Sequence, residues 1–155
     1  MTDVLTKEQR SRCMASIKSK NTKPELAIRR LVRRMGFRFR LNVAHLPGKP
    51  DMVFPSRNKL IFVHGCFFHK HRCRYGNVVP KTNRSFWDNK RRSNAMRDKK
   101  VVGELKKLGW DVLVIWECWI KKGYHLEEMI SRFMLSKTNL AKNTGVNKNH
   151  KGGEI

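Results

Sequence analysis

Four residues are of the types that bind soft metal ions and are spaced so that they could share one: Cys66, His71, Cys73 and Cys118. Thiolate and imidazole groups are the usual ligands of tetrahedral Zn²⁺, and four protein ligands close the site to substrate. We therefore predict a structural Cys3His zinc site. On spacing alone, His64 or His69 could replace His71, and in the alternative interpretation Cys118 is a core thiol without a metal. Cys13 is expected to remain free.

Carboxylates are scarce in this sequence, so their positions are informative. Asp51 follows Gly48-Lys-Pro50 and opens a short apolar run, while His64 and His69 lie at and beyond the end of a second run. A carboxylate there could hold Mg²⁺ against a DNA phosphate and so neutralise the charge that builds up during hydrolysis. A histidine could accept a proton from the attacking water. An ordinary turn aspartate after proline is the common alternative, but the nearby histidines favour catalysis.

Two adjacent aromatic residues, Phe67 and Phe68, lie within the segment that the predicted zinc ligands enclose. Neighbouring side chains of a strand point to opposite faces, so a core could bury only one of them comfortably. An apolar wedge inserted between DNA base pairs explains the pair better. Trp87, which has several basic neighbours, is a third candidate for stacking on bases. Trp110 and Trp116 bracket an apolar run and are expected in the core.

The charge balance indicates the class of partner. The 155 residues include 35 Lys and Arg but only 12 Asp and Glu, a formal net charge of +23. Clustered basic residues bind a phosphate backbone by releasing its counterions, so we expect a nucleic-acid ligand and not an ordinary small-molecule metabolic enzyme. No apolar run approaches the roughly 18 residues that span a membrane. The N-terminus lacks the apolar stretch of a secretory signal, so we expect an intracellular protein without disulfides.

Apolar periodicity predicts the elements that must position these residues. A helix between Thr22 and Gly36 opens with Thr-x-x-Glu, a capping box that gives Glu25 a structural role beside any role near a metal. The elements expected after it are strands over 51–54 and 60–63, a basic helix over 85–108, a buried strand over 111–116 and a helix over 126–135. This order predicts an α/β sandwich around a central mixed sheet.

We expect one domain over residues 1–135 and a basic, disordered tail over 136–155, which is rich in Asn, Lys and Gly. Residues 1–20 are basic and partly amphipathic. Met14 and Ile17 are spaced three apart there, which fits a short helix or arm lying on DNA phosphates as well as a helix packed on the core.

The longer motifs resemble those of one known family, the very-short-patch repair (Vsr) DNA mismatch endonucleases. The resemblance is carried by Leu46-Pro-Gly-Lys-Pro-Asp51, by Ile61-Phe-Val-His-Gly-Cys-Phe-Phe-His69 with His71 and Cys73, by Phe86-Trp87, and by Leu108-Gly-Trp-Asp-Val-Leu-Val-Ile-Trp-Glu-Cys118. It extends from Arg10 to the last helix and leaves out only the tail.

The resemblance implies a restriction-endonuclease-like core, with a central mixed β-sheet flanked by helices and a structural zinc site. It also implies Mg²⁺-dependent nicking of one strand on the 5′ side of the thymine in a T·G mismatch, which arises when 5-methylcytosine deaminates. The partner is then double-stranded DNA with such a mismatch, and the function is linked to a cytosine-5 DNA methyltransferase. From the resemblance we also expect a monomer that acts in the bacterial cytoplasm and contacts mismatch-repair proteins.

The family's residue roles can be carried onto the matching positions. Asp51 is implied as the metal carboxylate, the main-chain carbonyl of Val63 as a second metal ligand, and His69 as the general base, while Glu25 and His64 order water around the metal. The other implied roles are zinc binding by Cys66, His71, Cys73 and Cys118, intercalation by Phe67, Phe68 and Trp87, and mismatch recognition by Lys90, Asn94, Met14 and Ile17.

The sequence departs from the family's pattern in three places. Val63 stands where the best-known pattern has Thr, which is harmless if only the carbonyl serves, and Phe68 replaces a Trp, which reduces stacking area. The Glu-x-Lys half-motif of the wider restriction-enzyme superfamily is missing at Asn58-Lys-Leu60, which moves the base role to His69. Two alternatives remain: a non-catalytic zinc-stabilised DNA-binding protein, and a restriction-type endonuclease that cuts both strands of an unmodified site.

Overall fold

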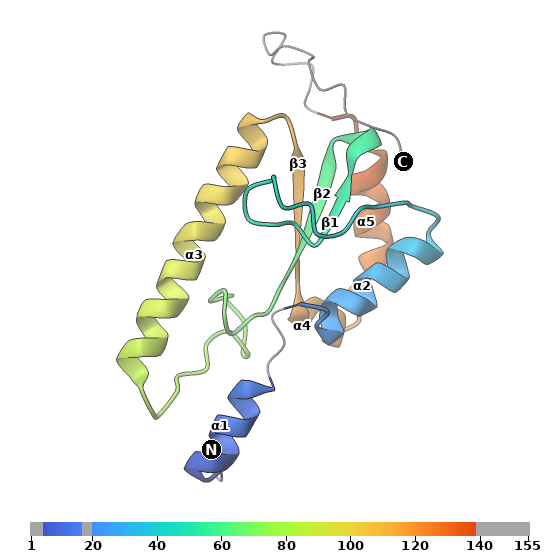
Figure 1. Cartoon of the computed structure of the whole chain (residues 1–155). Coiled ribbons are helices and arrows are strands. Elements are labelled where there is room, and N and C mark those ends of the chain that lie inside the picture. The colour runs from blue at the N-terminus through green and yellow to red at the C-terminus, as the bar shows by residue number, and fades with distance from the viewer. Residues whose placement is uncertain (1–4, 17–19, 139–155) are drawn as a thin grey trace.

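The structure is a computed structural model that describes residues 5–16 and 20–138. Its elements are α1 (Lys7–Ala15), α2 (Lys23–Arg34), β1 (Met52–Phe54), the 3-10 turn η1 (Pro55–Arg57), β2 (Lys59–His64), α3 (Arg84–Lys107), β3 (Asp111–Trp116), α4 (Glu117–Lys121) and α5 (Leu126–Leu135) (Figure 1). The predicted α/β architecture is confirmed, and α4 is an addition that periodicity did not indicate. Ile17 and the predicted tail beyond residue 138 lie outside the described residues.

The three strands form one mixed sheet in the order β1-β2-β3. β1 runs antiparallel to β2, and β2 runs parallel to β3. Strand β3 is therefore an edge strand and not the central one, although its run of apolar residues suggested burial. Both of its faces are nevertheless covered, because Val112 and Val114 pack into one core while Leu113 and Ile115 pack into the other.

Alternating strand residues supply two separate cores, one on each face of the sheet. Ile61 and Val63 pack with apolar residues of α2 and α5, whereas Leu60 and Phe62 pack with Leu105 of α3. The result is three layers, with α3 on one side of the sheet and α2 and α5 on the other (Figure 1). Near-continuous apolar runs are what a strand covered on both faces requires.

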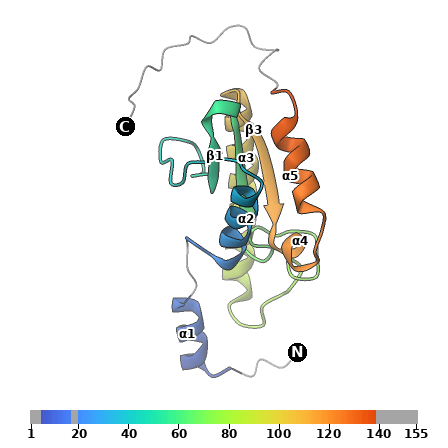
Figure 2. The ribbon, with the colours of Figure 1, turned by 90° about the vertical axis from the view of Figure 1, so that its right-hand side faces the viewer.

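The first helix stands apart from these layers. Figure 2 shows α1 below the sheet, and none of its described residues is buried. Met14 is 47% exposed, so it does not pack on the core. No helix within the described segments combines the length and apolarity that a membrane crossing needs.

The loop before β1 lies unusually close to α3. Gly48 has a φ of +73°, and a Cβ atom at this position would lie 2.4 Å from Cγ1 of Val101. Only glycine allows this approach without displacing the helix. The contact fixes where the chain enters β1, and with it the position of Asp51.

The buried ammonium of Lys59 gives a stability prediction. Its Nζ lies 3.3 Å from Oδ2 of Asp111 and 2.9 Å from Oγ of Ser136, and the residue is 1% exposed. Asp111→Ala should lower the free energy of unfolding by about 3–5 kcal/mol, since it leaves a buried charge uncompensated. Lys59→Met should lower it much less, because Asp111 keeps contact with water. Urea denaturation of both variants checks this, and a larger loss in Lys59→Met would contradict it.

Candidate active site

A cavity of about 460 Å³ brings the predicted catalytic residues together. Its lining includes residues from α2, from the loop before β1, from β2, from the loop after β2 and from α3: Glu25, Asp51, Val63, His64, His69 and Asp98. The proximity of Asp51 to the two histidines, which the sequence only suggested, is therefore present in the fold. Lys49 and Arg97 line the same cavity and give it cationic edges.

Asp51 is a carboxylate held in an unfavourable environment. The backbone N–H of Val63 donates a 2.7 Å hydrogen bond to its Oδ2. Burial raises the pKa of Asp51 to about 6 against the opposing effect of this hydrogen bond, and the nearby carboxylate of Glu25 raises it further. Two carboxylates that repel each other in a partly desolvated cavity are a donor set that suits a hard divalent cation.

Glu25 is anchored at the start of α2. Its backbone N–H is capped by the hydroxyl of Thr22, and its Oε2 accepts a 2.9 Å hydrogen bond from the backbone N–H of Asn21. In a regular capping box the Glu25 side chain would accept from the backbone N–H of Thr22. Here it accepts from the N–H of Asn21, one residue earlier, so the predicted capping box is present in a shifted form. Arg29 also donates to Oε2 of Glu25 at 3.3 Å. These hydrogen bonds together hold the Glu25 carboxylate beside the cavity.

His64, the last residue of β2, stacks face to face with His69 of the following loop. Their ring centres are 3.9 Å apart and their planes differ by 6°. Burial, followed by the proximity of His69, lowers the pKa of His64 to about 4, so His64 is neutral at physiological pH. Its buried Nδ1 has no hydrogen-bond partner among the residues that the structure describes.

Asp98 is a site residue that sequence reasoning missed. Its Oδ2 lies 2.6 Å from Nδ1 of His69. Burial would raise the pKa of Asp98, but the hydrogen bond and charge of His69 outweigh it, so the pKa is lowered and the carboxylate is ionised. An ionised Asp98 accepts a hydrogen bond from Nδ1–H of His69, which leaves the lone pair on Nε2. A carboxylate placed directly between Arg97 and Lys99 in a basic helix was the available signal.

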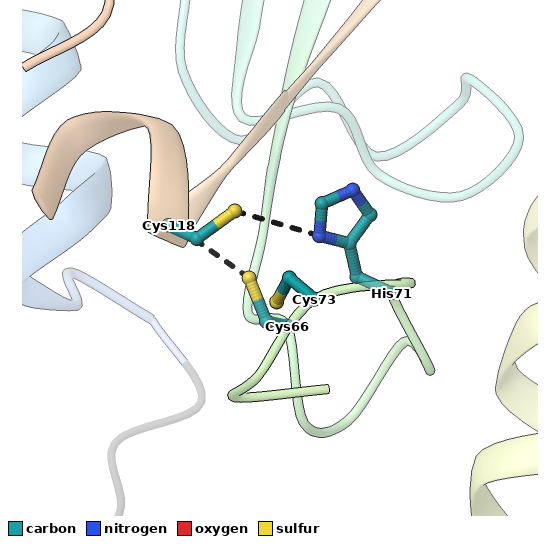
Figure 3. A group of neighbouring side chains, drawn as sticks. All are labelled: Cys66, His71, Cys73 and Cys118. Carbon is teal, nitrogen blue, oxygen red and sulfur yellow. Dashed lines mark hydrogen bonds between the residues drawn. The ribbon is translucent and has the colours of Figure 1, made fainter. Parts of the chain in front are cut away.

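The four predicted zinc ligands form a second cluster, which Figure 3 shows. One ligand atom from each of them lies within 4.8 Å of all the others: Cys66, His71, Cys73 and Cys118. Sγ of Cys118 lies 3.5 Å from Nδ1 of His71, and the backbone N–H of Cys118 donates to Sγ of Cys66 at 3.3 Å. Sγ of Cys73 accepts from the N–H of Gly76 at 3.3 Å. His71 and not His64 or His69 completes this group.

The chemistry of this cluster fits a metal ion. Burial raises the pKa of the Cys66 thiol to about 12 and also raises the pKa of Cys118, so without a cation these thiolates are disfavoured. A cation among them would offset that penalty. All four cysteines are free thiols, and Cys13 is the exposed one away from the cluster. A possible Cys/His metal site is therefore part of the fold.

Trp116 lies between the two clusters. Its ring stacks on His71 at 4.2 Å with planes 13° apart, and it meets His64 edge-on at 5.3 Å. The prediction that this tryptophan belongs to the core is wrong in part, because it is half-buried and contacts histidines of both sites. It ends β3 directly opposite His64, which explains the contact.

The three predicted wedge residues form one half-buried aromatic cluster. Phe67 meets Phe68 at 5.3 Å and Trp87 at 5.4 Å, both in edge-to-face geometry. The loop that carries the two phenylalanines runs between Cys66 and His71, and His69 follows them directly. One short loop therefore carries aromatic, histidine and metal-binding side chains together.

Three of the four predicted mismatch-recognition residues lie beside this aromatic cluster, and the fourth, Ile17, is outside the described residues. Nζ of Lys90 lies 5.7 Å from the ring centre of Trp87. The amide of Asn94 is already engaged, because its Nδ2 donates to the carbonyl of Phe68 at 3.0 Å and its Oδ1 accepts from Arg97. Met14 lines a groove between α1 and the start of α3, which Trp87 also lines.

The raised pKa of Asp51 predicts a pH-dependent stability in metal-free protein. Between its usual pKa of 3.8 and the folded value of about 6, the folded state binds more protons than the unfolded state, so stability falls as the pH rises. Asp51→Asn should therefore raise the free energy of unfolding at about pH 7.5 by roughly 1–3 kcal/mol. The gain should shrink as the pH falls from about 6 and vanish below about pH 3, where Asp51 is protonated in both states. Denaturant unfolding across this range checks it, and a gain independent of pH would contradict it.

Comparison with known proteins connects these features to a family. The family described as "DNA mismatch endonuclease Vsr" matches residues 2–75. Type II nicking enzyme V.XorIIP of Xanthomonas oryzae pv. oryzae is 48% identical over 118 residues, which are 76% of this chain and 86% of that protein. Type II nicking enzyme V.NmeAIP of Neisseria meningitidis is 41% identical over 134 residues, 86% of this chain and 95% of that protein.

A third relative carries the family's own name. DNA mismatch endonuclease Vsr of Escherichia coli is 40% identical over 121 residues, which are 78% of this chain and 77% of that protein. These aligned lengths exceed two thirds of both chains, and the family match contains Asp51, both stacked histidines and three of the four clustered metal-binding residues. The chain belongs to the Vsr family of DNA mismatch endonucleases.

Proposed function

We propose that this protein nicks one strand of duplex DNA on the 5′ side of the thymine in a T·G mismatch and requires Mg²⁺ to do so. The observation that carries the proposal is the direct succession of Phe67, Phe68 and His69 in one loop. It puts an aromatic cluster suited to base stacking next to a cavity suited to phosphodiester hydrolysis. An enzyme that must find a distorted base pair and cut beside it needs this adjacency.

The carboxylate side of the cavity is where we assign Mg²⁺. Asp51 would bind it directly, with the main-chain carbonyl of Val63 as a second ligand and Glu25 ordering water. When bound there, Mg²⁺ neutralises negative charge that develops on the phosphate in the transition state. Lys49 and Arg97 at the cavity's edge attract the DNA backbone.

The histidine side of the cavity supplies proton transfer. Asp98 holds His69 with Nδ1 protonated, so Nε2 can accept a proton from the attacking water. His64 stays neutral because of its burial, and its stacked ring prevents His69 from turning away. Asp98 is thus a positioning residue for the proposed base.

The proposed metal of the Cys/His cluster is Zn²⁺, because three cysteines and one histidine are a usual tetrahedral donor set for that ion. Its role is structural, since four protein ligands leave no open position. We further propose a monomeric cytoplasmic enzyme with a restriction-endonuclease-like core. In the proposed pathway it acts on sites of a cytosine-5 DNA methyltransferase and contacts mismatch-repair proteins.

One observation favours a second candidate function. Several relatives are named type II nicking enzymes, which suggests nicking set by a sequence context. In that case a fully paired site would be cut as readily as its T·G counterpart. Parallel assays on T·G and T·A duplexes of the same sequence separate the two functions, and a third outcome, binding without nicking, would favour the non-catalytic alternative.

The catalytic assignment predicts the behaviour of two variants. Asp51→Asn should abolish nicking of a T·G duplex in Mg²⁺ and leave mismatch binding largely intact. His69→Ala should slow single-turnover nicking by about 10²–10⁴-fold, the usual contribution of a positioned general base. His45→Ala, which changes an exposed histidine outside the cavity, is the matched control. A loss below tenfold in His69→Ala would move the base role to another group.

The zinc assignment predicts that metal analysis finds one zinc per chain. Chelation should release the loop between Cys66 and Cys73, and thiol titration should then find the three clustered cysteines newly reactive. Cys13 should react before and after chelation, because it is exposed and outside the cluster. Cys13→Ser should keep its zinc, whereas Cys118→Ser should lose it. Four reactive thiols and no zinc in untreated protein would contradict the site.

The wedge assignment predicts a loss of selectivity. Replacing both Phe67 and Phe68 with Ala should weaken T·G binding, since each stacked aromatic contributes roughly 1–3 kcal/mol. The ratio of nicking rates on T·G and T·A duplexes should fall, while zinc remains bound. Tyr124→Ala, at a half-exposed aromatic outside the cluster, should leave the ratio unchanged. An unchanged ratio in the double variant would make the phenylalanines ordinary packing residues.

A further inference from the structure

Arg91 is a buried cation whose role neither the catalytic cavity nor the metal cluster explains. It extends from α3 and is 4% exposed. Its Nε donates to the carbonyl of Phe67 at 2.7 Å, its Nη1 to the carbonyl of Val78 at 3.1 Å and its Nη2 to the carbonyl of Gly76. Among the described residues no carboxylate forms an ion pair with it, and the three carbonyl oxygens satisfy its N–H donors instead. Three separate points of one loop are thus tied to a single side chain.

The guanidinium also contacts the aromatic cluster itself. It lies 4.7 Å from the ring centre of Phe67, so the same group holds both the backbone and the ring of that residue. Trp87 lies four residues before Arg91 on α3, hence on the same face of the helix, and its ring meets Phe67 at 5.4 Å. Arg91 therefore holds Phe67 in the position where its ring meets Trp87.

The loop needs such a clamp because it contains neither helix nor strand. Between β2 and α3 the chain has no ladder to satisfy its carbonyls, and the metal-binding side chains anchor it only at Cys66, His71 and Cys73. A planar guanidinium with five fixed N–H donors can reach three carbonyls at once, which a lysine ammonium on a flexible stem does less well. One turn later, Asn94 holds the carbonyl of Phe68 in the same manner.

We infer that Arg91 is a positioning residue for mismatch discrimination: it presets the aromatic cluster of Phe67, Phe68 and Trp87 in the arrangement that enters the base step. The inference rests on the proposed function and deepens it. A cluster that is ordered before it meets DNA loses less conformational freedom on insertion. Selectivity comes from the cost of opening the base step, which is lower at a T·G pair than at a well-stacked T·A pair. Without the clamp the rings would not enter the step as a unit, so this difference in cost would no longer act on the nicking rate.

Arg91→Met and Arg92→Met form a matched pair of variants. Arg92 is adjacent and exposed, so its replacement removes the same charge without touching the loop. Nicking rates on T·G and T·A duplexes are measured in Mg²⁺, together with the fluorescence of 2-aminopurine placed in the step beside the mismatch. Arg91→Met should reduce the T·G to T·A ratio and the fluorescence rise by about tenfold or more, as expected for a lost cluster of buried hydrogen bonds. Arg92→Met should weaken binding to both duplexes alike and keep the ratio.

Two further variants make the test specific to the aromatic cluster. In protein that already lacks both phenylalanine rings, Phe67→Ala with Phe68→Ala, adding Arg91→Met should not lower the ratio again. Arg91→Lys should give an intermediate ratio, because it keeps the charge but not the planar fork. Additive losses in the triple variant would overturn the inference. So would unfolding or zinc loss in both Arg91→Met and Arg91→Lys, since Arg91 would then be required by the fold as a whole.

The wild-type protein separates this inference from the proposed function. If it shows no preference for T·G over T·A, the proposed function fails and the inference falls with it. If the wild-type preference is present and Arg91→Met retains it in full, only the role of Arg91 is refuted.

Discussion

The parallel register of β2 and β3 is the constraint on which both functional clusters depend. It pairs Lys59 with Asp111 at one end and His64 with Trp116 at the other. Two residues beyond the last pair, His64 and Trp116, the same alignment brings Cys66 opposite Cys118. The backbone N–H of Cys118 donates to the Cys66 sulfur. A shift of one residue would turn every side chain of β3 to the other face. The register therefore decides at once the buried ion pair, the histidine–tryptophan contact and the metal-binding group.

The loop that follows β2 carries side chains of both clusters and of the aromatic group. Cys66, His71 and Cys73 anchor it to the end of β3, and α3 anchors it again through Arg91 and Asn94. Between these anchors lie the aromatic residues and His69, so one segment determines where DNA would be opened and where a proton would be accepted. Asp51 reaches the same cavity from the other side, because β1 pairs with β2 and Val63 donates to its carboxylate. Asp51 and His64 thus lie at strand ends, where the sheet holds their backbone and the cavity keeps their side chains accessible.

Most of the core elements and the metal-binding group could be predicted from the sequence. Apolar periodicity predicted the helices and strands, because each strand is covered on both faces and each core helix has a clear apolar side. The spacing of Cys66, His71, Cys73 and Cys118 predicted a metal-binding group, since those residue types have few other reasons to cluster. What periodicity missed is local, since α4 is too short to show a period. For α1 the sequence left a helix or an arm open, because this helix has no buried face. Asp98 and Arg91 escaped notice because, in a basic helix, single polar residues look like solvated surface.

The sequence alone determined the core helices and strands, the polyanion-binding charge and the donor types of both clusters, because these follow from composition and short-range spacing. Only the tertiary structure decided which partners meet. It selected His71 over His64 and His69 for the metal-binding group, paired His69 with Asp98, and placed the β3 strand at the sheet edge. Each of these choices joins residues far apart along the chain, and their distance depends on strand register and on the packing of α3 against the sheet. Such distances are properties of the folded core, which no local pattern of residues contains.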